Sequence, residues 1–310
     1  MPSLSPANLA LFLASGLLTP FAAAQHRLPP SSNANFLAVS NLVLVPVTVL
    51  DRNGATINGL PSGLFSIFED KLPQRIDSFS EQDAPASIGV ILDLSGSMKD
   101  SLRLAKSVLR LFFATANSED DAFLYTVSNL PKKLTGFITD FETILGLVAD
   151  APAIGRTALI DTIYSGLTEI HSATHARKAL FVVSDRMDHQ GRYSEAQLIA
   201  HAEESDAQIY GISIYRPPVN KKTIELQEER RGLRLLDDLA LKTGGLHLVV
   251  RNEKDVTQAV STIGHALRNR YLIGYVPQNP SHKGKWHPIR VKLNLPDVIV
   301  ATRSGYRSEQ

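Results

Sequence analysis

The feature that most constrains the fold is an apolar run that ends in a cluster of short oxygen-bearing side chains. Residues 88–92 read Ile-Gly-Val-Ile-Leu, and Asp93-Leu94-Ser95-Gly96-Ser97 follows directly. A continuous apolar run predicts a strand that is buried on both faces, as in a parallel sheet covered by helices. Carboxylate and hydroxyl oxygens on a surface loop after such a strand suit a small, hard cation such as Mg²⁺.

Two segments further along the chain complete a recognisable set. Gly155-Arg156-Thr157 places a threonine before a predicted helix, and the apolar residues 179–183 lead to Ser184-Asp185. Together with Asp93-Leu94-Ser95-Gly96-Ser97, and in this order, they resemble the metal-ion-dependent adhesion site of a von Willebrand factor type A domain. Three short motifs at the expected ends of strands and starts of helices are far more specific than one.

The resemblance implies a role for each residue. Ser95, Ser97 and Thr157 would offer hydroxyl oxygens to Mg²⁺ (or Mn²⁺ or Ca²⁺), and Asp93 and Asp185 would mostly hold waters or hydroxyls around it. The metal would keep one open position, which an Asp or Glu side chain of a protein partner fills. The simpler alternative is that Ser95 and Ser97 only cap the next helix, as serine commonly does.

Two arginines depart from the family pattern beside this site. Arg156 stands where the family usually has glycine, and Arg186 follows Asp185 where the family usually has glycine. Near the metal, both would weaken cation binding by repulsion and would attract an anionic ligand, so they form a candidate rim for a partner. An equally simple alternative is that both point into solvent.

The N-terminal residues predict export. Residues 9–18 form a short apolar stretch, and Ala22-Ala23-Ala24-Gln25 follows, which is typical of a secretory signal cleaved after Ala24. An uncleaved anchor is the alternative, but ten residues are short of the roughly 20 that span a bilayer. We expect a periplasmic, cell-surface or secreted protein. A net charge of +1 argues against a nucleic-acid-binding protein, and the chain has no cysteine for a disulfide or a thiolate site.

Strand and helix patterns alternate through the middle of the chain. Strands are expected over residues 122–127, 180–183, 209–214 and 246–250, and helices over 99–117, 139–149, 157–170, 194–204, 233–242 and 253–269. This alternation predicts an α/β fold with a doubly wound, mostly parallel sheet, whose ligands bind at the carboxyl ends of the strands. Residues 217–231, rich in Lys, Glu and Arg, are interpreted as a solvated loop that runs into the next helix.

The two flanks of this region have alternating patterns typical of β-structure. Segments 38–50, 64–69 and 75–79 precede it, and 271–276, 288–293 and 298–303 follow it. Neither flank alone can build a two-layer core, so we expect one small β module formed from both ends of the chain. The predicted order is a signal peptide (1–24), a flexible leader (25–35), the first half of the β module (36–84), the type A domain (86–269) and the second half of the module (270–307).

This layout resembles the exported von Willebrand factor A-related proteins common in soil bacteria such as acidobacteria. The residues that carry the likeness in the flanks are Val49-Leu50-Asp51-Arg52-Asn53-Gly54, Phe65-Ser66-Ile67-Phe68-Glu69-Asp70, Lys242-Thr243-Gly244-Gly245, Tyr271-Leu272-Ile273-Gly274-Tyr275 and Arg303-Ser304-Gly305-Tyr306. The resemblance adds little about the ligand, because the partners of these proteins are largely unknown.

Other constellations in the chain are weaker. His171 and His175 have a spacing that can bind Zn²⁺, but a solvated helix end explains them as well. Asp185 and His189 raise the possibility of a metal-dependent hydrolase, although no nucleophile elbow or further catalytic motif accompanies them. We therefore expect a non-enzymatic, metal-dependent protein-binding module. The alternatives are an envelope scaffold whose metal is purely structural and, less favoured, the hydrolase.

Overall fold

The structure is a computed structural model that describes residues 42–185, 191–215, 223–278 and 284–308. The predicted signal peptide and leader, together with Arg186 and His189, lie outside these residues. Among the described residues, no helix has both the length and the apolar character needed to cross a membrane.

The centre of the chain forms a six-stranded sheet in the order β10-β9-β8-β5-β6-β7. Its strands are β5 (Ala86–Asp93), β6 (Asp121–Val127), β7 (Lys132–Ile138), β8 (Arg177–Ser184), β9 (Gln208–Ile214) and β10 (His247–Val250). All neighbours are parallel except β6 and β7, which pair antiparallel. The predicted α/β fold with a mostly parallel sheet is confirmed.

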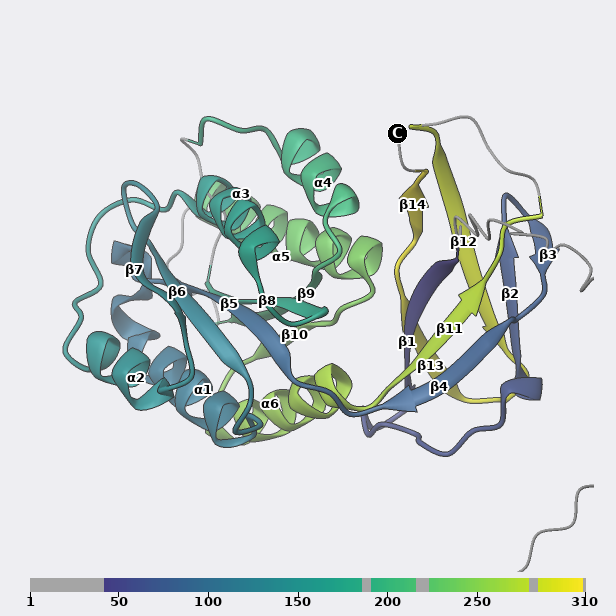
Figure 1. The fold of residues 1–310 in the computed structure, drawn as a ribbon. Coiled ribbons are helices and arrows are strands. Elements are labelled where there is room, and N and C mark those ends of the chain that lie inside the picture. The colour runs from purple at the N-terminus through teal and green to yellow at the C-terminus, as the bar shows by residue number, and fades with distance from the viewer. Residues whose placement is uncertain (1–41, 186–190, 216–222, 279–283, 309–310) are drawn as a thin grey trace, which may run out of the picture. The chain divides into compact units, whose positions relative to one another are not determined.

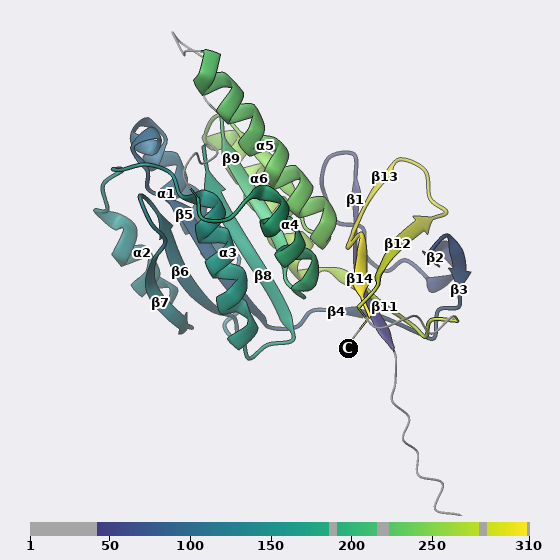
Figure 2. The ribbon, with the colours of Figure 1, turned by 90° about the horizontal axis from the view of Figure 1, so that it is seen from above.

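Helices cover both faces of this sheet (Figures 1 and 2). One face packs against α1 (Leu102–Ala114), α2 (Phe141–Ala149) and α6 (Glu253–Arg268), and the other against α3 (Leu159–Glu169), α4 (Glu195–Glu204) and α5 (Thr223–Thr243). Burial on both faces explains why β5 has no exposed residue and why its sequence is apolar from Ile88 up to the terminal carboxylate of Asp93.

Two sequence-based expectations fail within this domain. The interpretation of residues 217–231 as a loop is wrong from Thr223 onward, because α5 already begins there. The first half of α5 is rich in charged residues in the sequence, so the apolar period that reveals a helix is weak there. The edge strand β7 was also missed. It begins with two lysines and contains Gly136, and an antiparallel edge strand needs no continuous apolar run.

The two flanks form a β module of two four-stranded antiparallel sheets. One sheet has the order β13-β1-β11-β4 and the other β14-β12-β2-β3. The strands are β1 (Val43–Asp51), β2 (Phe65–Glu69), β3 (Leu72–Gln74), β4 (Ser78–Gln82), β11 (Arg270–Tyr275), β12 (Trp286–Leu293), β13 (Val298–Thr302) and β14 (Gly305–Arg307). Each sheet mixes strands from both ends of the chain, so neither flank can complete a sheet alone.

The core of the β module joins the inward side chains of the two sheets. Val45 and Val47 of β1 and Ile273 of β11 have no exposed surface, and they belong to the same apolar cluster as Ile67 of β2 and Val291 of β12. The α/β domain is therefore inserted between the two halves of a β sandwich, as the sequence predicts.

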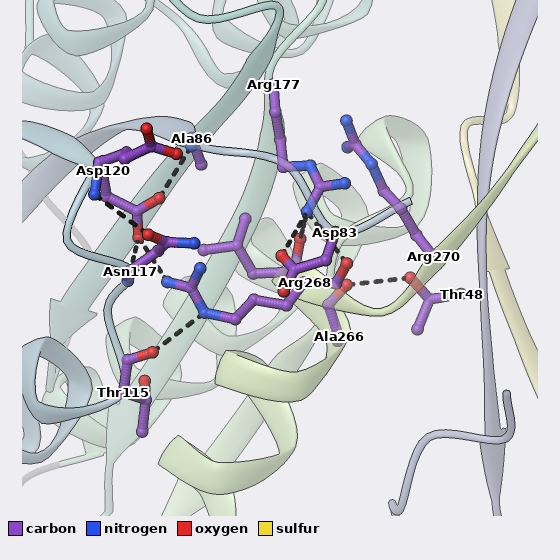
Figure 3. Close-up of polar contacts among 12 residues, drawn as sticks. Thr48, Asp83, Ala86, Thr115, Asn117, Asp120, Arg177, Ala266, Arg268 and Arg270 are labelled. Carbon is purple, nitrogen blue, oxygen red and sulfur yellow. Dashed lines mark hydrogen bonds and ion pairs between the residues drawn. The ribbon is translucent and has the colours of Figure 1, made fainter. Parts of the chain in front are cut away.

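A buried polar group anchors the end of α6, next to the point where the chain crosses into the β module (Figure 3). Asp120 is fully buried. Its carboxylate accepts hydrogen bonds from the backbone N–H of Ala86, at 2.9 Å, and pairs with the guanidinium of Arg268. Arg177 donates to the carbonyl oxygens of Leu267 and Arg268, at 3.1 and 3.0 Å. The last carbonyl groups of α6, which no helical N–H can reach, thus have side-chain donors.

One bond in this group links the domain to the β module. The Thr48 hydroxyl of β1 donates to the carbonyl oxygen of Ala266 at 3.3 Å, and Thr48 has no exposed surface (Figure 3). The end of α6 is consequently held both by its own domain and by the first strand of the β module.

Candidate functional site

The candidate metal site begins with Asp93, the last residue of β5, whose side chain has no exposed surface. Its Oδ1 accepts from the backbone N–H of Ser95 at 2.8 Å, and its Oδ2 accepts from the Ser184 hydroxyl at 2.5 Å. Burial, and then the neighbouring charge of Asp185, raises the pKa of Asp93 to about 7, while the bonds from Ser184 and Ser95 act in the opposite direction. The sequence places this carboxylate on a surface loop; in the structure it is buried.

The serine hydroxyls meet Asp185 across the ends of two neighbouring strands. The hydroxyl oxygens of Ser95 and Ser97 lie 3.0 Å apart, and Ser97 donates to Asp185 Oδ1 at 2.7 Å. Ser95 is buried, whereas Ser97 and Asp185 are half-buried. Parallel strands end at the same edge of a sheet, which is why β5 and β8 deliver these residues to one place. The helix-capping alternative is not supported, because Ser95 makes no side-chain cap to the 3₁₀ turn Gly96–Asp100 that follows it.

Backbone hydrogen bonds hold the Thr157 loop against the serine loop. Gly96 N–H donates to the Gly155 carbonyl at 2.9 Å, and Ile154 N–H donates to the Leu94 carbonyl at 2.8 Å. Gly155 has a φ of +88°, and a Cβ there would lie 2.9 Å from Asn129 Oδ1, so this position needs glycine. Thr157 is half-buried and precedes α3, which begins two residues later than predicted.

Of the two arginines predicted for the rim, Arg156 lies within the described residues and Arg186 does not. Arg156 is exposed, and its backbone N–H donates to Asn129 Oδ1 at 2.8 Å. Two large apolar side chains were not anticipated beside it: Leu130 is 60% exposed and Ile154 is 63% exposed. They stand on the loop that carries Asn129 and on the loop that leads to Thr157, so the surface around Arg156 combines positive charge with apolar area.

The chemistry of these donors fits a divalent cation. The group offers hydroxyl oxygens from Ser95 and Ser97 and carboxylate oxygens from Asp93 and Asp185, and the Thr157 loop is fixed beside them. Hard oxygen donors of this kind are those that Mg²⁺, Mn²⁺ and Ca²⁺ prefer. A cation would also offset the cost of the buried Asp93 charge next to Asp185.

The structure also contains a hydrogen-bonded group of three polar residues that the sequence did not predict. The Ser213 hydroxyl lies 2.8 Å from His247 Nε2, and His247 Nδ1 lies 2.7 Å from Asp237 Oδ1. This is the connectivity of a serine-hydrolase triad. A nucleophile must meet its substrate, however, and Ser213 is only 5% exposed within a strand that has neighbours on both sides. We interpret the three residues as a polar link that ties the edge strand β10 to β9 and α5.

The histidine pair considered from the sequence does not form a metal site. His171 Nδ1 lies 2.9 Å from the Leu167 carbonyl oxygen, which is a hydrogen bond within the end of the helix. Among the described residues, the group that combines three potential metal ligands from His, Asp and Glu lies elsewhere, in the β module.

Comparisons with known proteins agree with this architecture. No protein-family model matches the chain, and no curated protein matches it. Among solved structures, a von Willebrand factor type A protein from Catenulispora acidiphila is 12% identical, with 76% of this chain and 74% of that chain covered and a TM-score of 0.50. An aerotolerance-related membrane protein from Bacteroides fragilis is 16% identical, with 59% and 98% covered and a TM-score of 0.46.

A third match is proximal thread matrix protein 1 from the mussel byssus, whose structure has a zinc-occupied adhesion-site motif. It is 14% identical, with 62% of this chain and 49% of that chain covered and a TM-score of 0.49. The class of protein is therefore a doubly wound α/β domain with a polar loop cluster at the carboxyl ends of its strands. More specifically, the chain has the von Willebrand factor type A fold.

Proposed function

We propose that this protein is a metal-dependent protein-binding module. Asp93, Ser95, Ser97, Thr157 and Asp185 form its site for Mg²⁺, with Mn²⁺ or Ca²⁺ as substitutes. The observation that carries the proposal is the convergence of Ser95, Ser97 and Asp185, with distances of 3.0 and 2.7 Å between successive oxygens. When bound, the cation supplies a Lewis-acidic position for one more oxygen ligand.

The partner would supply that ligand from an Asp or Glu side chain. Arg156 supports an anionic ligand, because an exposed guanidinium at the rim attracts a carboxylate and can pair with it. The exposed side chains of Leu130 and Ile154 favour a partner with apolar area beside its acidic residue, since burying them would add to the binding energy. Arg186 stays a predicted second member of this rim.

The proposal includes export and a non-enzymatic role. Residues 1–24 are the basis for export to the periplasm, the cell surface or the medium. A binding role is favoured over hydrolysis because Ser213 and the His247 side chain are buried, and because Ser213, His247 and Asp237 do not belong to the proposed metal site. A structural metal in an envelope scaffold is the other reading of the same site.

Two measurements test the proposal. Calorimetry on the purified chain should show one Mn²⁺ or Mg²⁺ bound, and binding should be lost when Ser97 and Asp185 are both replaced by alanine. The purified protein is then immobilised and exposed to an extract of the native cell envelope. Envelope proteins that bind to it should be released by EDTA and should bind again when Mn²⁺ is added. The immobilised double variant should not retain them. Binding of envelope proteins that is unaffected by EDTA and by the double substitution would contradict metal-dependent capture. Metal binding without any bound envelope protein would favour the scaffold with a structural metal.

A further inference from the structure

A second group of metal-ligand side chains lies in the β module. Glu69 ends β2, Asp70 follows it in the turn to β3, and His287 stands on the neighbouring strand β12. His287 Nδ1 lies 2.8 Å from Asp70 Oδ2 and 3.6 Å from Glu69 Oε1. One ligand atom from each of the three residues falls within 4.8 Å of the other two. None of these residues was singled out as a site in the sequence.

Burial and charge make this group different from an ordinary surface cluster. The side chains of His287 and Glu69 are only 1% and 4% exposed, and Asp70 is 37% exposed. Among the described residues, no Lys or Arg lies within ion-pair distance of either carboxylate. Two carboxylates and one imidazole therefore leave negative charge in a largely buried place, where it is costly without a cation.

The histidine also has an unsatisfied nitrogen. Its Nε2 is buried and has no hydrogen-bond partner among the described residues. If Nδ1 carries the proton, it can satisfy one carboxylate, and Nε2 is left as an acceptor without a donor. If Nε2 carries the proton, the Nδ1 lone pair faces two carboxylate oxygens. A cation bound at Nδ1 removes that second conflict, because the lone pair then becomes a ligand.

Two tyrosines orient the buried carboxylate. Glu69 Oε2 accepts from the Tyr275 hydroxyl at 2.6 Å and from the Tyr306 hydroxyl at 3.1 Å. Burial, followed by the interaction with Glu69, raises the pKa of both tyrosines, so both hydroxyls keep their protons and remain donors. These bonds occupy Oε2 and leave Oε1 directed at His287, as hydrogen-bonded outer groups do for the carboxylate ligands of metal sites.

We propose that Glu69, Asp70 and His287 bind one divalent transition-metal cation, of which Zn²⁺ is the natural probe. Zn²⁺ prefers four ligands at about 2.0 to 2.2 Å in a tetrahedron, which places ligand atoms about 3.3 Å apart. The observed separations of 2.8 and 3.6 Å from Nδ1 lie on either side of that value. Asp70 is exposed to solvent, so the ion would enter from its side and a water would be the fourth ligand. Imidazole nitrogen among the donors favours Zn²⁺ over Mg²⁺.

Such an ion would clamp the β2–β3 turn to β12. Asp70 and its neighbour Lys71 both have positive φ, and the turn is joined to β12 by the bond from Asp70 N–H to the Pro288 carbonyl at 3.1 Å. Since β2 comes from the N-terminal flank and β12 from the C-terminal flank, the metal would join the two halves of the β module. Binding to the folded form only would raise its stability by mass action.

The test uses the full chain with the first site disabled by Ser97→Ala and Asp185→Ala, so that it does not depend on the proposed function. Titration with Zn²⁺ should show one ion per chain, and the midpoint of thermal unfolding should rise with Zn²⁺. Adding Asp70→Asn should weaken Zn²⁺ binding at least tenfold and abolish the thermal shift. Asparagine tolerates the φ of +49° at this position, so the variant should fold. Asp150→Asn, at an exposed carboxylate outside the cluster, serves as the matched control.

Glu69→Gln is the second variant, because glutamine still accepts from the two tyrosines and removes the charge. Loss of Zn²⁺ binding in both Asp70→Asn and Glu69→Gln, with binding retained in Asp150→Asn, supports the site. The proposal is overturned if the chain with the first site disabled binds no Zn²⁺, or if Asp70→Asn binds it with unchanged affinity.

Discussion

Ser97 donates a 2.7 Å hydrogen bond to Asp185, although 88 residues separate the two in the chain. The bond joins the loop after β5 to the end of β8, two neighbouring strands of the parallel sheet. The serine loop and Asp185, the two parts of the proposed metal site, are therefore in direct contact through protein atoms alone.

The first prediction concerns this serine. Ser97→Ala should weaken Mn²⁺ binding about tenfold or more, because it removes a hydroxyl oxygen from the proposed set and a donor from Asp185. The free energy of unfolding of the metal-free protein should change little, since Ser97 is only half-buried. Isothermal calorimetry and urea unfolding in EDTA would measure both, with Ser118→Ala at an exposed turn as the control. Unchanged Mn²⁺ affinity would remove Ser97 from the site.

The second prediction concerns the loop that carries Thr157. Gly155→Ala should cost about 1 to 3 kcal/mol and should weaken metal binding, because φ is +88° and the new Cβ would press on Asn129. Gly136→Ala is the matched control, since a Cβ there meets nothing within 4 Å and the backbone needs no positive φ. Equal stability and equal Mn²⁺ affinity in the two variants would show that the Gly155 conformation does not position Thr157.

The third prediction concerns the buried carboxylate of Asp93. Its pKa is raised to about 7 in the folded protein, whereas an unfolded aspartate titrates near 4. Between pH values of about 4 and about 7, Asp93 is protonated in the folded state and ionised in the unfolded state. Its contribution to the free energy of unfolding therefore falls as the pH rises through this range. Asp93→Asn should therefore stabilise the metal-free protein by about 1 to 3 kcal/mol at pH 8 and by less at pH 5.

Urea unfolding in EDTA at the two pH values would check this. The same substitution should weaken Mn²⁺ binding. Added Mn²⁺ should therefore stabilise the unsubstituted protein more than Asp93→Asn, and the difference between their free energies of unfolding should shrink or change sign. An advantage of Asp93→Asn that does not change between pH 5 and pH 8 would contradict the assigned role of burial and of the Asp185 charge.

The fourth prediction concerns the anchor of α6. Asp120→Ala should cost about 3 to 5 kcal/mol, because it leaves the guanidinium of Arg268 largely buried without its partner and frees the N–H groups of Ala86 and Asn117. The control Asp297→Asn breaks the exposed ion pair with Arg52 and should lower the free energy of unfolding by less than about 1 kcal/mol, because asparagine tolerates the φ of +60° at this position. Hydrogen exchange should show faster opening of the last turn of α6 in Asp120→Ala alone.

This anchor also bears on coupling between the two modules. If partner binding at the metal moves α6, the bond from Thr48 to Ala266 carries the motion into β1. Any such motion must first break buried bonds from Arg177 and Arg268, so the loosened Asp120→Ala protein should show a changed partner affinity. Identical affinities would mean that the end of α6 stays fixed.

The sequence by itself determined the type of fold and the order of the candidate metal residues. The apolar runs before Asp93 and Asp185 mark parallel strands, and strands of a parallel sheet end at one edge, so their contact could be anticipated. The pairing of the two flanks could also be anticipated, because each contains β patterns that need partners to bury an apolar face.

Only the tertiary structure decided that Asp93 is buried. It also decided which residues far apart in the sequence are in contact, because no local sequence pattern relates them. His287 meets Asp70 across 217 residues, and Ser213 meets His247 only because β9 and β10 are paired in one register. Leu130 and Ile154 carry no local signal of exposure either. Such contacts depend on how strands pair and where loops turn, and these are set by packing across the whole chain rather than by neighbouring residues.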